Sequence, residues 1–157
     1  MPQTSRVLCC RWAGLAVPGP LPPQPSIGLQ SATGSFLDRP GWDAFREVVE
    51  GLRRACPAAK PVVVRTAWLP RTILGECVRR PQRFVVRLNR AMDQHMAIET
   101  LCHEWAHALA WNYSLDKLAR QAGVSPQEFD LASHDEAWGC AYSRVWRAYL
   151  DVIREAA

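Results

Sequence analysis

The chain has 157 residues, of which 48% are hydrophobic and 22% charged, and its net charge is +4. This length suits one domain, and the composition supports a hydrophobic core, which excludes collagen, a coiled coil and a wholly disordered chain. No run approaches the roughly 20 apolar residues that a membrane helix needs. The apolar patch near the N-terminus is interrupted by Arg11, which makes a poor secretory signal. We therefore expect a cytoplasmic protein with no membrane partner.

The first 34 residues differ in composition from the rest of the chain. Five prolines lie between positions 18 and 25. Such a density blocks helices and central strands and favours extended, solvated backbone. The sequence therefore predicts a proline-rich disordered tail over residues 1–34 and a single domain over residues 35–157.

Hydrophobic periodicity predicts one helix and then three strands at the start of this domain. Apolar residues at helical spacing cover residues 41–55, and the helix ends before Pro57. From Pro61 the period changes to two, which predicts strands at 62–68, 73–79 and 83–89. Residues 80–82 suit a hairpin connection between the last two strands. We therefore expect a small, mainly antiparallel, three-stranded sheet.

The helical period returns after the sheet. Asp93 can cap a helix that runs to about residue 111, and a shorter helix is expected over 115–122. Ser125 and Glu128 have the spacing of a capping box, and so do Ser133 and Glu136 at the start of a long last helix. One helix, then strands, then helices is the order of an α+β fold.

A short motif in the helix predicted over 93–111 points to metal chemistry. The segment His103-Glu104-Trp105-Ala106-His107 has the pattern H-E-x-x-H. Residues four apart on a helix lie on one face, so both imidazoles can bind one zinc ion. Glu104 can then act as general acid and base on a water held by that zinc. A single catalytic Zn²⁺ is the expected cofactor.

A catalytic zinc needs a third protein ligand. His95 lies about two turns ahead of the motif on the same helix, too far along the axis to share the site. His134 is 27 residues beyond His107, which is enough chain to return, and it is the expected third ligand. Glu136 and Asp135 remain alternatives, although both also suit the first turn of a helix.

Two blocks of sequence resemble the SprT-like zinc metallopeptidases, in particular small members that phages and prophages encode. The first block is ETLCHEWAHA (residues 99–108) and the second is HDEAWG (residues 134–139), which is similar to the family's H-G-x-x-[FW] element. The resemblance covers residues 41–148 and implies a zincin-like fold, with His103, His107 and His134 as zinc ligands and Glu104 as general acid and base. A phage-encoded member would work in the host cytoplasm.

Two departures from the family pattern matter for function. Asp135 replaces the usual glycine, and no cysteine-pair zinc ribbon follows the domain. We expect a zinc-dependent metallopeptidase that hydrolyses peptide bonds in a protein or peptide substrate through a zinc-bound water activated by Glu104. The alternative is a non-catalytic binding module that zinc stabilises, with DNA as a candidate partner.

The charges are unevenly distributed along the chain. Residues 60–90 contain eight basic side chains and one acidic one, whereas residues 91–157 contain five basic and ten acidic ones. Arginines on one face of the sheet would suit contacts with nucleic-acid phosphates. The opposing interpretation is that they solubilise the sheet and pair with the acidic helices. The candidates for a DNA contact are Arg79, Arg80, Arg83 and Arg87.

Overall fold

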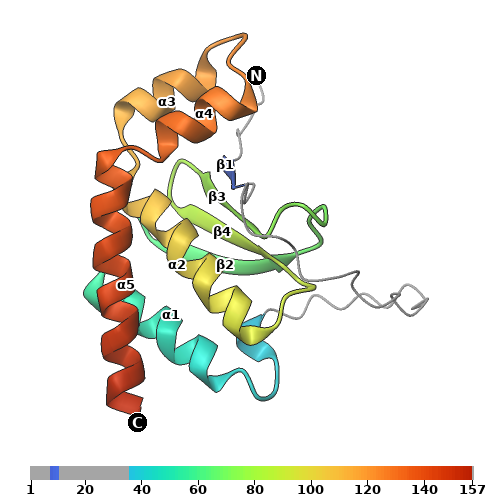
Figure 1. The fold of residues 1–157 in the computed structure, drawn as a ribbon, viewed down its shortest axis with the longest axis vertical. Helices are drawn as coiled ribbons and strands as arrows, with labels where there is room; N and C mark the ends of the chain where they lie inside the picture. The colour runs from blue at the N-terminus through green and yellow to red at the C-terminus, as the bar shows by residue number, and fades with distance from the viewer. Residues whose placement is uncertain (1–7, 11–35, 157) are drawn as a thin grey trace, which may run out of the picture.

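The computed structural model describes residues 8–10 and 36–156 (Figure 1). The first elements are strand β1 (Leu8–Cys10), the short 3-10 helix η1 (Phe36–Asp38), helix α1 (Asp43–Ala55) and strands β2 (Val62–Ala67), β3 (Gly75–Arg79) and β4 (Phe84–Asn89). Helices α2 (Gln94–Ala110), α3 (Tyr113–Arg120), α4 (Pro126–Ser133) and α5 (Glu136–Ala156) follow. Strands and helices are separated along the chain, which confirms the predicted α+β class. No helix in these ranges is long and apolar enough to cross a membrane.

The sheet has the strand order β1-β3-β4-β2. Strands β3 and β4 form the expected antiparallel hairpin, in which the Arg80 amide donates to the Arg83 carbonyl at 2.8 Å. Strand β1 is antiparallel to β3, whereas β2 is parallel to β4. The sheet is therefore mainly antiparallel, as predicted, although one of its three strand pairs is parallel.

The predicted number of strands was wrong. Within the described residues the sheet has four strands, whereas three were predicted. The additional strand β1 lies inside the predicted 1–34 tail and pairs with the edge of β3, with Cys10 opposite Gly75. An open strand edge presents unpaired backbone groups, and β1 satisfies those of β3. The remainder of the predicted tail lies outside the described residues.

A buried asparagine fixes the connection from β2 to β3. The Asn89 Nδ2 donates to the carbonyls of Leu69, Pro70 and Ile73 at 3.2, 3.3 and 2.9 Å. Asn89 ends β4, and its side chain thus holds the loop that lets the chain leave β2 and re-enter the sheet two positions away. This loop explains how β2 and β4 come to lie parallel.

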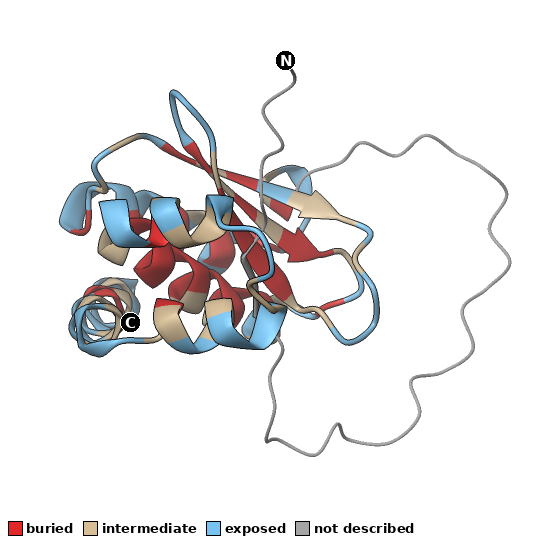
Figure 2. Ribbon diagram, turned by 90° about the horizontal axis from the view of Figure 1, so that it is seen from above, coloured by how far each residue is buried: buried red, intermediate tan, exposed pale blue. Residues whose placement is uncertain are grey.

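The core lies between the sheet and helices α1, α2 and α5, where the buried residues of Figure 2 gather. Phe84, Val86 and Leu88 alternate along β4 and are buried, as the period of two predicted. Trp105 of α2 is 1% exposed, and its indole N–H donates to the Cys56 carbonyl at 2.9 Å. This hydrogen bond ties α2 to the end of α1 within the core.

Two of the three predicted helix starts are confirmed. The Asp93 carboxylate accepts from the Met96 amide at 2.9 Å, and the Ser125 capping box is present at α4. The predicted box of Ser133 with Glu136 is wrong. Ser133 belongs to α4, where its hydroxyl donates to the Asp130 carbonyl, and Asp135 accepts from the Trp138 amide at the start of α5. The turn between α4 and α5 therefore consists of His134 and Asp135.

Candidate metal centre

Three histidines from distant parts of the chain meet beside α2. His103 and His107 lie one turn apart on α2, and His134 follows the last residue of α4. The Nε2 of His103 is 3.2 Å from the Nε2 of His107 and 3.1 Å from the Nε2 of His134. The structure thus brings the three predicted ligands together, with the same ring nitrogen of each directed at one point.

The spacing of these nitrogens suits a metal ion. Two nitrogens bound to a tetrahedral zinc at about 2.05 Å are roughly 3.3 Å apart. The two measured separations are within about 0.3 Å of this value, and the ligand atoms of all three histidines lie within 4.8 Å of one another. His103, His107 and His134 therefore form a group that can hold a metal ion.

The alternative third ligands do not belong to this group. Glu136 is exposed in the first turn of α5, and it is not among the residues whose ligand atoms cluster. The Asp135 carboxylate caps α5 by accepting from the Trp138 amide at 2.9 Å. His95 is also elsewhere, since it is exposed on α2 and lies 3.4 Å from the Glu99 carboxylate.

The orientation of His134 is set by its own helix. Its Nδ1 lies 2.8 Å from the backbone carbonyl of Asp130, one turn earlier on α4, and 3.6 Å from the Asp130 carboxylate. A neutral imidazole that donates from Nδ1 to a carbonyl carries its lone pair on Nε2. Such a contact behind a ligand fixes both its tautomer and its ring direction. The α4 backbone therefore orients His134 so that its Nε2 lone pair can be donated to a metal ion.

Burial keeps the two histidines of α2 uncharged. Desolvation, followed by the charge of His134, lowers the pKa of His103 from 6.5 to about 4. Desolvation also lowers the pKa of His107 well below its ordinary value, and the charges of His103 and His134 add to this effect. Metal ligation needs neutral imidazoles, so the folded protein offers them at neutral pH without the cost of removing protons.

We expect the metal-free protein to lose stability as the pH falls from about 6.5 to about 4. The unfolded state takes up a proton at His103 over this range, whereas the folded state with its lowered pKa does not. At about 1.4 kcal/mol per pKa unit, the loss reaches up to about 3 kcal/mol. Urea unfolding of chelator-treated protein at several pH values measures it. A His103→Gln variant should show a shallower dependence, and identical slopes for the two proteins would contradict the assignment.

Glu104 lies on the sheet side of α2, next to the histidines. Its exposed fraction is 0%, and a Cβ added to Gly75 of β3 would lie 3.0 Å from the Glu104 Cγ and 3.2 Å from its Oε1. Burial raises the pKa of the Cys77 thiol on β3, and the Glu104 charge raises it further, which also places the carboxylate near this strand. The motif glutamate is therefore held in a dry space between α2 and β3.

We expect Gly75→Ala to destabilise the protein by about 1–3 kcal/mol, the usual cost of overpacking a core. The new methyl carbon would lie 2.6 Å from the Thr100 Cγ2 and would also press on Glu104. Gly139→Ala is the control, because nothing lies within 4 Å of a Cβ on Gly139 in α5. There alanine should stabilise the helix by up to about 1 kcal/mol. Urea unfolding compares the variants, and equal effects would disprove the close approach.

Trp138 is a site residue that sequence reasoning missed. Its ring centroid is 4.8, 5.6 and 4.6 Å from the rings of His103, His107 and His134. Its Nε1 is buried without a hydrogen-bond partner within the part of the chain that the structure describes. Its position four residues after His134, one turn along α5, was the available signal.

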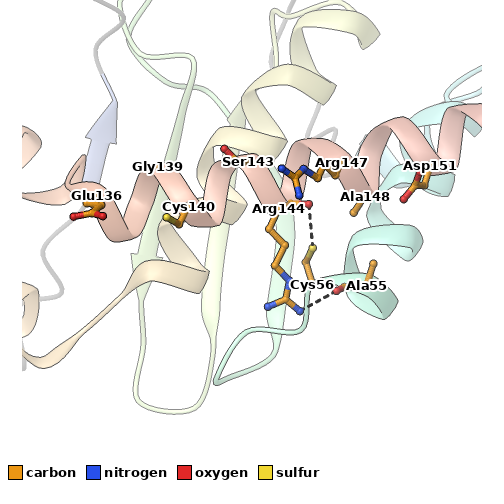
Figure 3. A pocket seen from close by; sticks show the side chains of 10 residues that line it. All are labelled: Ala55, Cys56, Glu136, Gly139, Cys140, Ser143, Arg144, Arg147, Ala148 and Asp151. Atoms are coloured by element: carbon orange, nitrogen blue, oxygen red, sulfur yellow. Dashed lines mark hydrogen bonds between the residues drawn. The ribbon is translucent and has the colours of Figure 1, made fainter.

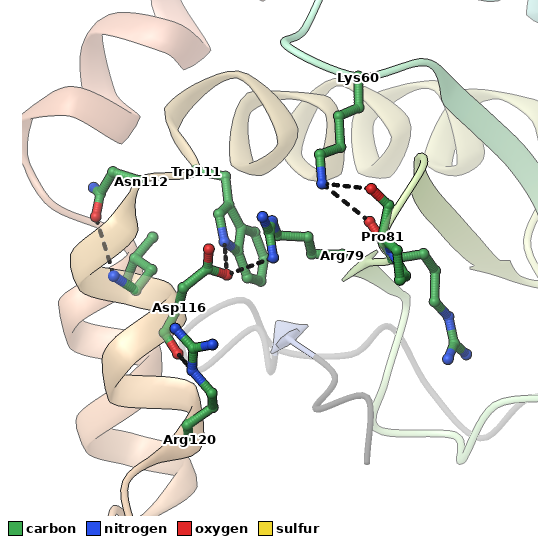
Figure 4. A network of polar contacts seen from close by, with 9 residues as sticks. Lys60, Arg79, Pro81, Trp111, Asn112, Asp116 and Arg120 are labelled. Atoms are coloured by element: carbon green, nitrogen blue, oxygen red, sulfur yellow. Dashed lines mark hydrogen bonds and ion pairs between the residues drawn. The ribbon is translucent and has the colours of Figure 1, made fainter. Parts of the chain in front are cut away.

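The four candidate arginines do not form one free basic surface. Arg79 lies 3.1 Å from the Asp116 carboxylate of α3, which also accepts from the Trp111 indole at 2.8 Å (Figure 4). Arg87 pairs with the buried Glu76. Arg80 and Arg83 are exposed at the β3–β4 hairpin. The pairing of Arg79 with an acidic residue of a C-terminal helix is the kind of contact that the opposing interpretation predicted, and a DNA contact stays a prediction.

The fold and the histidine group define an α+β protein with a candidate metal centre between α2 and the turn that joins α4 to α5. Comparison with protein-family models, curated proteins and solved structures gave no match to this chain.

Proposed function

We propose that this protein is a zinc-dependent metallopeptidase, with His103, His107 and His134 as the zinc ligands and Glu104 as the general acid and base. The observation that carries the proposal is the convergence of three Nε2 atoms. Those of His107 and His134 lie 3.2 and 3.1 Å from that of His103, the residue that directly precedes Glu104 on α2. Three histidines leave the fourth position of a tetrahedral zinc for water or substrate, which distinguishes catalytic from structural sites.

Each group has a defined part in hydrolysis. Bound zinc would supply a Lewis acid and lower the pKa of a water molecule that it holds. The Glu104 carboxylate would accept one proton of the attacking water as the water oxygen bonds to the peptide carbonyl carbon. Glu104 then delivers that proton to the amide nitrogen as the C–N bond breaks, so that a carboxylic acid and an amine leave. Exclusion of solvent around Glu104 strengthens its electrostatic interaction with these groups.

The fixed geometry of the ligands supports the same proposal. His134 is oriented by the Asp130 carbonyl, and the Trp138 ring packs against all three imidazoles. A catalytic group acts efficiently only when it is held close to its productive position, and this support comes from packed neighbours and hydrogen bonds. The centre is therefore preorganised by α4 and α5, not only by the helix that carries the motif.

The proposal is tested by metal content together with chelator-sensitive cleavage. Protein purified without chelator should contain one zinc per chain. It should also cut a generic protein that is kept unfolded by reduction and alkylation of its cysteines. A chelator should stop the cleavage and added zinc should restore it. The assay is run with and without DNA, which also tests the DNA contact predicted for Arg79, Arg80, Arg83 and Arg87. Absence of bound zinc, or cleavage that survives the chelator, would refute the proposal.

A further inference from the structure

We propose that one face of α5 binds the substrate, and that the substrate is an unfolded polypeptide rich in apolar and aromatic side chains. This inference rests on the proposed function and names the substrate class of the same site. The face, called the apolar strip below, consists of Trp138, Tyr142, Trp146, Tyr149, Leu150 and Ile153.

The strip begins at the histidines and is continuous. The His103 ring lies 4.8 Å from the Trp138 ring, which stacks on Tyr142 at 5.1 Å and 8°. Tyr142 lies 6.0 Å from Trp146, and Trp146 lies 5.1 Å from Tyr149. These four aromatic residues are half-buried, and each packs against the hydrophobic core with the rest of its surface left accessible. A row of aromatic rings therefore runs from the candidate metal centre along α5.

The strip ends in two exposed aliphatic side chains. Leu150 and Ile153 are 41% and 43% exposed, and each follows an aromatic residue of the strip by four positions. Residues four apart lie on the same side of a helix, so these side chains extend the aromatic row toward the C-terminus. Exposed apolar side chains that continue a row of aromatic rings from a candidate site are a feature of binding surfaces.

The other side of α5 is polar. A pocket between α5 and the end of α1 is lined by Arg144, Arg147, Glu136 and Asp151, among others (Figure 3). There Arg144 donates to the Ala55 carbonyl at 3.1 Å, which ties α5 to α1. This pocket does not include the histidines. The helix thus keeps its charged residues away from the side that leads to the candidate metal centre.

The length of the strip sets the length of substrate that it can bind. From Trp138 to Ile153 the helix rises about 22 Å, at about 1.5 Å per residue. An extended peptide covers about 3.3 Å per residue, so the strip can contact about seven residues on one side of the bond that is cut. An unfolded segment can present seven consecutive residues in this way.

The negative charge of Glu99 beside the strip disfavours acidic substrates. Glu99 of α2 is 44% exposed, and its charge contributes, after burial and Cys102, to raising the pKa of both Tyr142 and Tyr149. Glu99 lies one turn before His103 on α2, and the His103 ring is 6.1 Å from the Tyr142 ring, so this carboxylate belongs to the part of α2 that lies beside the strip. Like charges in an interface disfavour binding, so apolar segments with neutral or basic neighbours are preferred over acidic ones.

Binding is tested first without catalysis. Two twelve-residue peptides are titrated calorimetrically into zinc-loaded Glu104→Gln protein, one with alternating Phe and Leu among Lys and Ser, the other with Gly, Ser and Asp only. The apolar peptide should bind at least tenfold more tightly. Leu150→Ser combined with Ile153→Ser should weaken that binding about tenfold, because apolar anchors dominate such interfaces. Tyr113→Ser, which removes an exposed side chain from α3, should leave the affinity unchanged.

Cleavage by the protein with Glu104 intact gives a second readout. The strip variant should raise KM for the apolar peptide about tenfold and leave kcat unchanged, because the lost contacts are remote from the reacting atoms. Equal affinities for the two peptides, or an equal effect of Tyr113→Ser, would overturn the inference. A dimer that the strip variant dissociates would also overturn it, by showing that a second copy covers the strip. Tight binding without any cleavage would instead refute the proposed function and support the strip as a peptide-binding surface.

Discussion

Glu104→Gln is expected to lower kcat for peptide cleavage by about 10²–10⁴-fold, the usual contribution of a positioned general acid or base. Glutamine has nearly the same shape as glutamate but cannot accept the proton of the attacking water. The fold should be unaffected or slightly stabilised, because the substitution removes a carboxylate whose exposed fraction is 0%. Zinc content should also stay unchanged, since Glu104 is not among the clustered ligands.

The measurement compares single-turnover cleavage and zinc content for the two proteins. Glu136→Gln is the matched control, because Glu136 was the alternative ligand in the sequence and is exposed at the start of α5. It should change neither quantity. Full activity of the Glu104→Gln variant would assign the proton transfers to another group. Loss of zinc from that variant would instead make Glu104 part of the metal centre.

The same variant separates the peptidase from a non-catalytic, zinc-stabilised binding module. The two hypotheses share all three ligands and differ only in what Glu104 does. For a binding module, wild-type protein shows no chelator-sensitive cleavage, and Glu104→Gln leaves partner binding as it was. For a peptidase, the variant retains substrate and fails to turn it over, which makes it a trap for the proteins that it binds.

The local parts of the site were predictable from the sequence. His103 and His107 lie on one helix face because their spacing is close to one turn, and Asp93 caps that helix as its position indicated. The prediction of His134 required only that the chain between residues 107 and 134 be long enough to return to His103 and His107. The sequence did not show how the return is made. Helices α3 and α4 supply it, and the Asp130 carbonyl directs the ring.

Features that depend on contacts between distant segments were not predictable. A period of two marks a strand but does not identify its partner, so the parallel pairing of β2 with β4 and the addition of β1 were missed. Trp138 has the spacing of a core residue on α5, yet the residues that its ring contacts there are the histidines of the candidate metal centre. A helical pattern shows that a residue faces inward and leaves open which residues it will meet there.

The arginines show the same limit for charge. Arg79 and Arg87 looked equivalent to Arg80 and Arg83 in the sequence, because all four lie in a basic stretch. Their acidic partners come from α3 and β3, and only the fold brings them together. A basic stretch therefore predicts a nucleic-acid-binding surface only for those arginines that are not paired with acidic residues of the same protein.

His134→Ala is expected to weaken zinc binding by more than about 100-fold, since the loss of a residue that merely supports a ligand already costs 10–100-fold. The protein should stay folded, because the His134 side chain is 24% exposed and lies at a turn between two helices. Competition with a chromophoric chelator measures the affinity, and circular dichroism checks the fold. His95→Ala is the control on α2, where the side chain is 76% exposed, and it should retain full affinity.

The contact behind His134 makes a further distinction possible. Because the backbone carbonyl of Asp130, at 2.8 Å, holds the ring, and its carboxylate lies farther away at 3.6 Å, Asp130→Asn should cost less than about tenfold in zinc affinity. A large effect of that substitution would mean that the carboxylate orients the ligand. Full zinc stoichiometry in His134→Ala would remove His134 from the centre altogether. It would restore Glu136 as the third ligand, which His134→Ala combined with Glu136→Gln would then confirm or exclude.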